Sequence, residues 1–302
     1  MQTISIEANE HVEELVDWFS NRVRIGEDNT IDIDVSYGGY SLNLAKIVCS
    51  PTLDKLSGKP SYGQNTLKVY VAGILADFIL RRYEEKLISR IINTNYCYFN
   101  FLEKRDILHF AIEYTQNDKN IFNNLSRIRR RNIITAKLLE YFDLSDSIIL
   151  DGFVNFRLKE YRKELEDIVD KAVDDFLMER EYKEFIKLLK YFVEIQEPKI
   201  NVIHILNRYD GKYVLLDEKK KEITNECTEE FLNEIAEGEI NYDDVLVSSL
   251  ITLAPSKVII HIENMFKNKE LLETIKNVFG SRVTICRGCE LCNINAAIKT
   301  EK

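Results

Sequence analysis

The sequence contains few of the residues that interrupt helices. Its 302 residues include 4 prolines and 11 glycines, and no proline lies between Pro60 and Pro198. Proline lacks a backbone donor and clashes with the preceding helical turn, so its absence leaves long helices unbroken. We therefore predict helices almost throughout residues 65 to 194.

A long apolar run is also missing. The most apolar stretch, Val69 to Leu80, contains Asp77 and is well short of the roughly twenty apolar residues that span a bilayer. The opening residues are acidic where a secretion signal is basic. The net charge of -9 argues against a general attraction to nucleic acid or anionic membranes. We expect a cytoplasmic protein that makes no contact with a membrane.

No recognised catalytic motif occurs. The sequence lacks G-x-x-x-x-G-K-[ST], G-x-G-x-x-G, G-x-S-x-G and H-E-x-x-H, which excludes the commonest nucleotide-binding, hydrolase and zinc-protease sites. Carboxylates at the ends of predicted elements could still hold a divalent ion. They are Asp217, Glu218, Asp243, Asp244 and Glu263. One hypothesis is therefore a metal-dependent nuclease or phosphohydrolase that acts through the C-terminal domain. We keep it as the alternative to a non-enzymatic binding protein.

The hydrophobic periodicity predicts an α+β fold in three segments. Residues 1–65 form a small N-terminal α/β segment with a strand near Ile4, a helix over residues 11–24 and a β-hairpin that turns at Gly38-Gly39. Glycine supplies the positive backbone angles that such a tight turn requires. A loop rich in proline and glycine then ends the segment.

Residues 66–197 are predicted to be mostly helical. Three apolar stripes follow spacings of three and four residues. They consist of Val69, Leu75, Phe78, Ile79, Tyr83, Leu87 and Ile91; of Leu125, Ile128, Ile133, Ala136, Leu139 and Leu144; and of Leu158, Tyr161, Leu165, Ile168, Val169, Ala172, Val173 and Phe176, continued by Tyr182, Phe185, Ile186, Leu189, Phe192 and Val193. We expect a break near Glu179. We favour packing inside this protein over docking to a partner helix.

Residues 198–302 are predicted to form a C-terminal mixed sheet covered by helices. The expected strands span residues 200–207, 212–217, 257–263 and 282–286, and the expected helices span 228–236, 242–253 and 268–279. Asp210-Gly211 predicts a β-hairpin between the first two strands. The last strand, helix and strand have the spacing of a right-handed parallel βαβ unit.

The strongest chemical signal is the cysteine motif near the C-terminus. Cys286, Cys289 and Cys292 form two overlapping C-x-x-C spacings, which in a reduced compartment let three thiolates converge on zinc or on an iron-sulfur cluster. A closed site needs a fourth ligand, which could be a distant Cys or His or a residue of a second subunit. The alternative is a redox pair or a turn without metal. We interpret Cys49, Cys97 and Cys227 as small buried side chains.

Two histidines interrupt apolar strands in the same segment. The carboxyl ends of the parallel strands share one edge of the sheet, so Glu263 and Cys286 should lie near one another, with His261 on the face of Glu263. A site of His261, Glu263 and the cysteines is geometrically permitted. We favour the interpretation that His204 and His261 are core residues with satisfied hydrogen bonds.

A cluster of arginines is the most concentrated positive charge. Arg127, Arg129, Arg130 and Arg131 could contact phosphates of a nucleic acid over one helical turn. In an acidic protein, ion pairs with neighbouring glutamates are the alternative, and we favour it.

The stretch DGFVNFRLKEYRKELEDIVDKAVDDFLMEREYKEFIKLLKYFV, from Asp151 to Val193, resembles the YtxC family, sporulation proteins of endospore-forming bacteria. The resemblance extends through DDVLVSSLITLAPSKVIIHIE to the cysteine-rich end. It implies a process, sporulation, and no reaction. We therefore expect a non-enzymatic, sporulation-associated protein that binds a protein partner of unknown identity.

Overall fold

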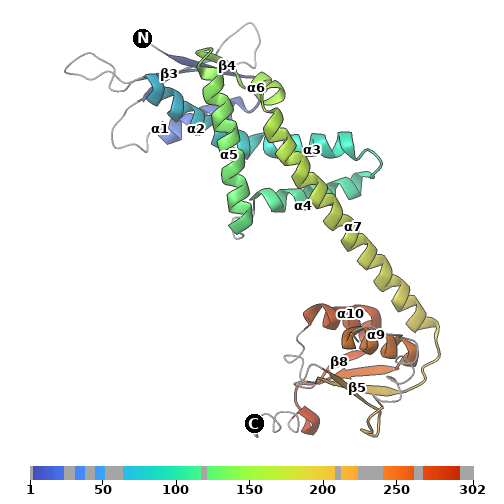
Figure 1. Cartoon of the computed structure of the whole chain (residues 1–302). Coiled ribbons are helices and arrows are strands. Elements are labelled where there is room, and N and C mark those ends of the chain that lie inside the picture. The colour runs from blue at the N-terminus through green and yellow to red at the C-terminus, as the bar shows by residue number, and fades with distance from the viewer. Residues whose placement is uncertain are drawn as a thin grey trace. The chain divides into compact units, whose positions relative to one another are not determined.

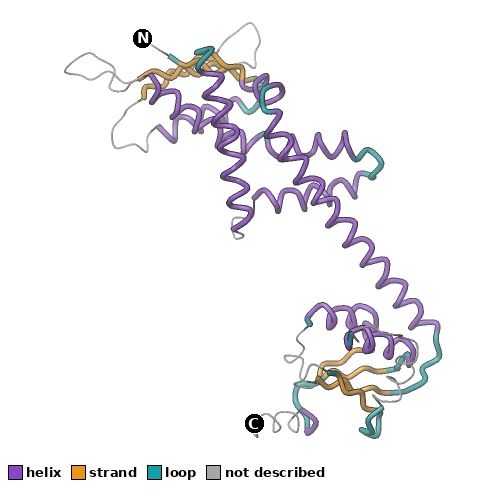
Figure 2. The backbone as a smooth tube through the Cα atoms, in the orientation of Figure 1, coloured by secondary structure: helices purple, strands orange, loops and turns teal. Residues whose placement is uncertain are grey.

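The structure is a computed structural model of the chain, and it describes residues 3–23, 31–37, 45–51, 64–116, 121–207, 212–223, 241–261 and 268–292. It divides into two compact units, Met1–Met178 and Glu179–Lys302. Each unit combines helices with a small mixed sheet of four strands (Figures 1 and 2). The predicted α+β fold class is thus confirmed.

The first unit contains a sheet in the order β2-β3-β1-β4. Its strands are β1 (Ile4–Ala8), β2 (Ile31–Tyr37), β3 (Ala45–Pro51) and β4 (Ser147–Ile149). The predicted hairpin is the antiparallel pair β2 and β3, and its expected Gly38-Gly39 turn lies outside the described residues. Strand β4 was not predicted. It has only three residues, too few to show an alternation of apolar and polar side chains. It pairs in parallel with β1.

The described residues form seven helices that begin in this unit, and the last of them continues past Met178. They are α1 (Val12–Val23), α2 (Gln64–Arg82), α3 (Glu84–Asn95), α4 (Phe101–Gln116), α5 (Ile121–Phe142), α6 (Leu150–Phe156) and α7 (Lys159–Ile195). The break expected near Glu179 is wrong, because α7 contains no proline or glycine and Lys183 pairs with Glu179 across one turn at 2.6 Å. Among the described residues, no helix has the length and apolar character needed to cross a membrane.

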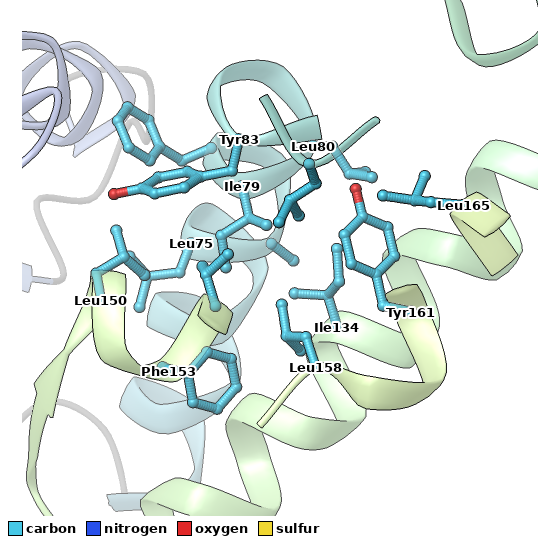
Figure 3. Close-up of a cluster of buried hydrophobic side chains, with 14 of the residues drawn as sticks. Leu75, Ile79, Leu80, Tyr83, Ile134, Leu150, Phe153, Leu158, Tyr161 and Leu165 are labelled. Carbon is cyan, nitrogen blue, oxygen red and sulfur yellow. The ribbon is translucent and has the colours of Figure 1, made fainter. Parts of the chain in front are cut away.

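The core of the first unit joins the sheet to the helices, and Figure 3 shows the part of it to which α2, α5, α6 and α7 contribute. Leu75, Ile79 and Tyr83 from the first predicted stripe are buried there beside Leu158 and Leu165 from the third. The second predicted stripe is only partly right: Ile133 and Leu139 pack at the margin of this core, but the stripe misses the most buried face of α5. Its members Leu125, Ile128 and Leu144 are exposed, whereas Arg130, Ile134, Leu138 and Phe142, spaced by four residues, are buried.

An arginine occupies this buried face because it has a complete set of partners. The Arg130 side chain is 0% exposed, and its Nε donates to Glu84 Oε2 at 3.0 Å. Its other nitrogens donate to the Ser126 hydroxyl and the Thr115 carbonyl, and Tyr161 donates to the same Glu84 oxygen at 2.8 Å. Arg130 therefore belongs to the core and is not available to a nucleic acid.

Two neighbouring arginines are also paired with acids. Arg129 contacts Glu164 at 2.7 Å, and Arg131 donates to Asp77 at 2.7 Å. The Asp77 carboxylate raises the pKa of Arg131 above its ordinary value. These pairs support the interpretation that the arginine cluster forms ion pairs within the protein.

The second unit contains a sheet in the order β6-β5-β7-β8. Its elements are β5 (Val202–Asn207), β6 (Tyr213–Leu216), α9 (Tyr242–Leu253), β7 (Lys257–Ile260), α10 (Lys269–Phe279), a 3-10 turn (Gly280–Arg282) and β8 (Val283–Ile285). The predicted hairpin is antiparallel, and β5, β7 and β8 are parallel, so the predicted βαβ unit is confirmed. Three predicted features lie outside the described residues: the helix over 228–236, the turn at Asp210-Gly211 and the strand end at Glu263.

One face of this sheet carries the core of the second unit. Ile203, Ile205, Val258 and Ile260 are 0% exposed and pack against α9 and α10. Because side chains alternate along a strand, His204 and His261 lie on the opposite face. The second half of α7 adds Ile186, Leu189 and Val193 to this core, whereas Tyr182, Phe185 and Phe192 of the same predicted stripe are exposed.

The buried ion pair of the first unit yields a prediction. Glu84→Gln should lower the free energy of unfolding by about 3–5 kcal/mol, because it leaves the Arg130 charge buried without a carboxylate. Urea unfolding followed by fluorescence of Trp18, the single tryptophan, whose ring Nε1 donates to the Ile74 carbonyl at 3.3 Å, reports on this unit.

The matched control is Glu164→Gln, which removes the partner of the exposed Arg129 and should cost at most about 1 kcal/mol. Replacing both members of the buried pair, by Glu84→Leu with Arg130→Met, should recover much of the loss. Equal effects of the two glutamate substitutions would contradict the assignment of Arg130 to the core.

Candidate metal centre

The site forms where two parallel strands end at the same edge of the sheet. His261 follows β7 and Cys286 follows β8. The Cys286 backbone N–H donates to the Ile260 carbonyl at 2.8 Å, and the His261 N–H donates to the Ile205 carbonyl at 2.9 Å. The ladder thus continues one residue beyond each strand and fixes both backbones. It brings Cys286 next to His261 although 25 residues separate them in the chain.

A turn after β8 returns the other two cysteines to the same place. Gly288 has a φ of +137°, a backbone angle that side-chain-bearing residues rarely adopt, so glycine suits this position. Leu291, between Cys289 and Cys292, packs against a small apolar cluster on the sheet. That cluster consists of Leu206, Val214 and Leu216. The turn is therefore held against the sheet by both its backbone and a side chain.

The four side chains bring one nitrogen and three sulfurs together. His261 Nδ1 lies 3.4 Å from Cys289 Sγ and 3.5 Å from Cys292 Sγ. Cys292 Sγ lies 3.8 Å from both Cys289 Sγ and Cys286 Sγ, and all four atoms lie within 4.8 Å of one another. A tetrahedral zinc site has Zn–S bonds of about 2.3 Å and Zn–N bonds of about 2.0–2.1 Å, which place sulfurs about 3.8 Å apart and sulfur and nitrogen about 3.6 Å apart. The observed separations fit one ion at the centre.

The environment of the thiols differs from one cysteine to the next. Burial opposes ionisation of Cys289, but hydrogen bonds from the Cys292 backbone and from the neighbouring thiols outweigh it and lower its pKa. Burial, together with the neighbouring thiols, raises the pKa of Cys292. Of these two thiols, Cys289 is thus the more easily ionised, and the thiolate is the form that binds a metal ion.

A second histidine lies behind the first. His204 Nδ1 is 2.9 Å from His261 Nε2, and the two rings are tilted by 30° with centroids 5.2 Å apart. Burial lowers the pKa of both imidazoles, and the nearby Lys220 adds to the effect. His261, which is 2% exposed, therefore lies between the thiols on one side and His204 on the other.

Two of the carboxylates proposed for the alternative enzyme, Asp217 and Asp243, have structural hydrogen-bond partners. Asp217 accepts the Lys221 N–H at 2.8 Å within a turn. Asp243 accepts from the Tyr213 hydroxyl and from the Asn268 amide, both at 2.7 Å. Glu218 and Asp244 are exposed, and Glu263 lies outside the described residues. Among the described residues, these carboxylates do not gather around the cysteines.

The three cysteines outside the motif were predicted to be buried, and the structure agrees for only one of the two that it describes. Cys49 is 0% exposed and burial raises its pKa to about 12, which confirms the prediction of a buried thiol. Cys97 is exposed, so the same prediction is wrong there, because it lies in the short connection between α3 and α4. Cys227 lies outside the described residues. None of the five described cysteines forms a disulfide.

Sequence reasoning found the three cysteines and left their fourth ligand open. It allowed a site of His261, Glu263 and the cysteines but favoured a core histidine with satisfied hydrogen bonds, and His261 is in fact 2% exposed and hydrogen-bonded to His204. The useful signal was its position one residue after a parallel strand, which is the position of Cys286 as well. The contact of His204 with His261 could not be found in this way, because it depends on β5 pairing in parallel beside β7.

Comparison with known proteins identifies the family of this chain. A model of the YtxC-like family matches residues 69–284. The chain belongs to the YtxC-like family. It is also 28% identical over 224 residues to a protein of Bacillus subtilis (strain 168) named "Uncharacterized protein YtxC", with 71% of this chain and 75% of that protein covered. No solved structure gives a significant match.

The matched segment includes both histidines and ends before the cysteines. His204 and His261 lie within residues 69–284, whereas Cys286 is the second residue after that segment. The family model therefore covers the strands that position the site and stops two residues before Cys286.

Proposed function

We propose that this chain is a non-enzymatic, sporulation-associated binding protein whose C-terminal unit is stabilised by one zinc ion. The observation that carries the proposal is the set of one imidazole nitrogen and three sulfurs, from His261, Cys286, Cys289 and Cys292, which lie within 4.8 Å of one another, with the 3.4, 3.5, 3.8 and 3.8 Å separations close to those around one tetrahedral zinc ion. Four protein ligands leave no open coordination position for a substrate or water. A site of this kind is structural and not catalytic.

Zinc fits these donors better than an iron-sulfur cluster does. In an iron-sulfur cluster, the sulfurs of cysteines that bind different irons are separated by the iron–iron distance as well as by their own bonds. These sulfurs therefore lie farther apart than two sulfurs bound to one zinc ion. Cys292 Sγ lies 3.8 Å from each of the other two sulfurs, which is the edge expected around one zinc ion. Iron-sulfur binding is the alternative outcome of metal analysis.

The zinc ion would join the turn after β8 to the end of β7. Zinc fingers without a hydrophobic core unfold when the metal is lost. This unit has its own core, formed by the sheet residues with α9 and α10. Loss of zinc should therefore loosen the turn and the edge of the sheet while the core stays folded.

Family membership supports the remaining parts of the proposal. The YtxC resemblance implies a role in sporulation, and a cytoplasmic location would keep the three thiols reduced and able to bind metal. The partner is taken to be a protein, because Arg129, Arg130 and Arg131 are engaged in internal ion pairs. Nucleic acid remains the alternative partner, although the buried Arg130 could not contact it.

Metal content tests the zinc site directly. The reduced full chain should bind about one zinc per chain, and zinc at about 1,000 times its dissociation constant should stabilise the second unit by about 4 kcal/mol. Changing Cys286, Cys289 and Cys292 together to serine should abolish both effects. The measurements are elemental analysis and hydrogen exchange of β5, β7 and β8.

Two controls accompany this experiment. Cys97→Ser changes an exposed cysteine outside the site and should leave zinc binding unaltered. Trp18 fluorescence, which reports on the first unit, should show the same urea unfolding with and without zinc. Zinc retained by the triple serine variant, or no zinc in the unaltered chain, would contradict the proposed metal centre.

Spore formation tests the proposed process. Deleting the gene in its own bacterium should lower the yield of heat-resistant spores, and the triple serine variant should lower it as well, since the C-terminal unit would lose its metal. The Cys97→Ser variant should sporulate normally. A deletion strain that forms spores as efficiently as its parent would refute the sporulation role and leave the metal centre unaffected.

A further inference from the structure

The His261 ring can bind a metal through Nδ1 only in one of its two neutral forms. A neutral imidazole carries one proton, on either Nδ1 or Nε2, and only the unprotonated nitrogen has a lone pair for a metal. The sulfurs of Cys289 and Cys292 lie 3.4 and 3.5 Å from Nδ1, so the proton of the metal-binding form must reside on Nε2. An acceptor facing Nε2 would select this form.

We propose that His204 is the positioning residue of the metal centre, accepting the Nε2–H of His261 on its own Nδ1 and holding the His261 lone pair toward the three thiolates. The inference rests on the proposed metal centre and extends it beyond the four ligands. The contact that carries it is the 2.9 Å separation of His204 Nδ1 and His261 Nε2. Ligating histidines commonly donate their second ring N–H to such a partner, which fixes the ring orientation and its proton.

Strand pairing makes this contact a built feature of the sheet. In the parallel register His204 stands opposite Ile259, and Ile259 and His261 point to the same face because they are two residues apart. The backbone bond from His261 N–H to Ile205 C=O fixes the ring beside β5. The two imidazoles therefore meet without any rearrangement of the backbone.

Burial gives the contact its importance. His261 is 2% exposed, so water has little access to Nε2–H, and among the described residues His204 is its recorded hydrogen-bond partner. Without that partner, the thiols would favour the form of His261 that carries its proton on Nδ1 and donates it to them. That form has no lone pair on Nδ1 and cannot bind the metal ion there. His204 itself is not a ligand, because its Nδ1 is occupied by the Nε2–H of His261.

Cobalt(II) and zinc titrations of the reduced full chain test the proposal. His204→Leu removes the acceptor and should weaken cobalt and zinc binding by about 10- to 100-fold, with altered cobalt d–d bands. His204→Asn keeps an acceptor oxygen near the position of Nδ1 and should retain most of the affinity. His109→Leu, at an exposed histidine on α4, is the matched control and should have no effect.

The outcomes separate this inference from the proposed function. A cobalt spectrum without thiolate charge-transfer bands in the unaltered chain would refute the metal centre itself. Unchanged affinity and spectrum in His204→Leu would overturn the role of His204 and leave the metal centre standing. Loss of binding in His204→Leu with recovery in His204→Asn would support it.

A measurement on the unaltered protein applies even if His204→Leu does not fold. Long-range proton–nitrogen NMR of the zinc-loaded chain should show His261 protonated on Nε2, with a slowly exchanging proton, and His204 unprotonated on Nδ1. A proton on Nδ1 of His204 facing His261 would overturn the proposal.

Discussion

The parallel alignment of β5, β7 and β8 is the constraint on which the candidate metal centre depends. Parallel strands that share a register end at one edge, so the residues that follow them meet there. His261 and Cys286 follow β7 and β8, and His204 lies beside them on β5. The helices α9 and α10 occupy the other face. The face with the histidines is thereby left to the cysteine turn.

Much of this second unit could be predicted from the sequence. Asn268 caps α10 and Gly280 ends it, as the periodic pattern and the glycine indicated. The βαβ spacing then placed the ends of β7 and β8 side by side, and the two C-x-x-C spacings marked the thiols. These features are local, or follow from one well-established rule of chain connection. The contact of His261 with the thiols and with His204 depends on the strand register as well, which local patterns do not contain.

The errors in the first unit have a related cause. The second stripe was assigned from apolar residues alone, but α5 buries Arg130 because Glu84, 46 residues away, supplies its charge partner. Strand β4 exists because β1 offers an unpaired edge to three residues that have little period of their own. In both cases a long-range partner decides the outcome, and a single sequence does not reveal that partner.

The proposed metal centre holds one zinc ion by three sulfurs and one imidazole nitrogen. X-ray absorption spectroscopy of the zinc-loaded full chain measures that coordination shell directly. We expect the spectrum to show three sulfurs at about 2.3 Å and one nitrogen at about 2.0–2.1 Å from the zinc ion. A shell of oxygen and nitrogen alone, or iron with iron neighbours in protein purified without oxygen, would contradict it.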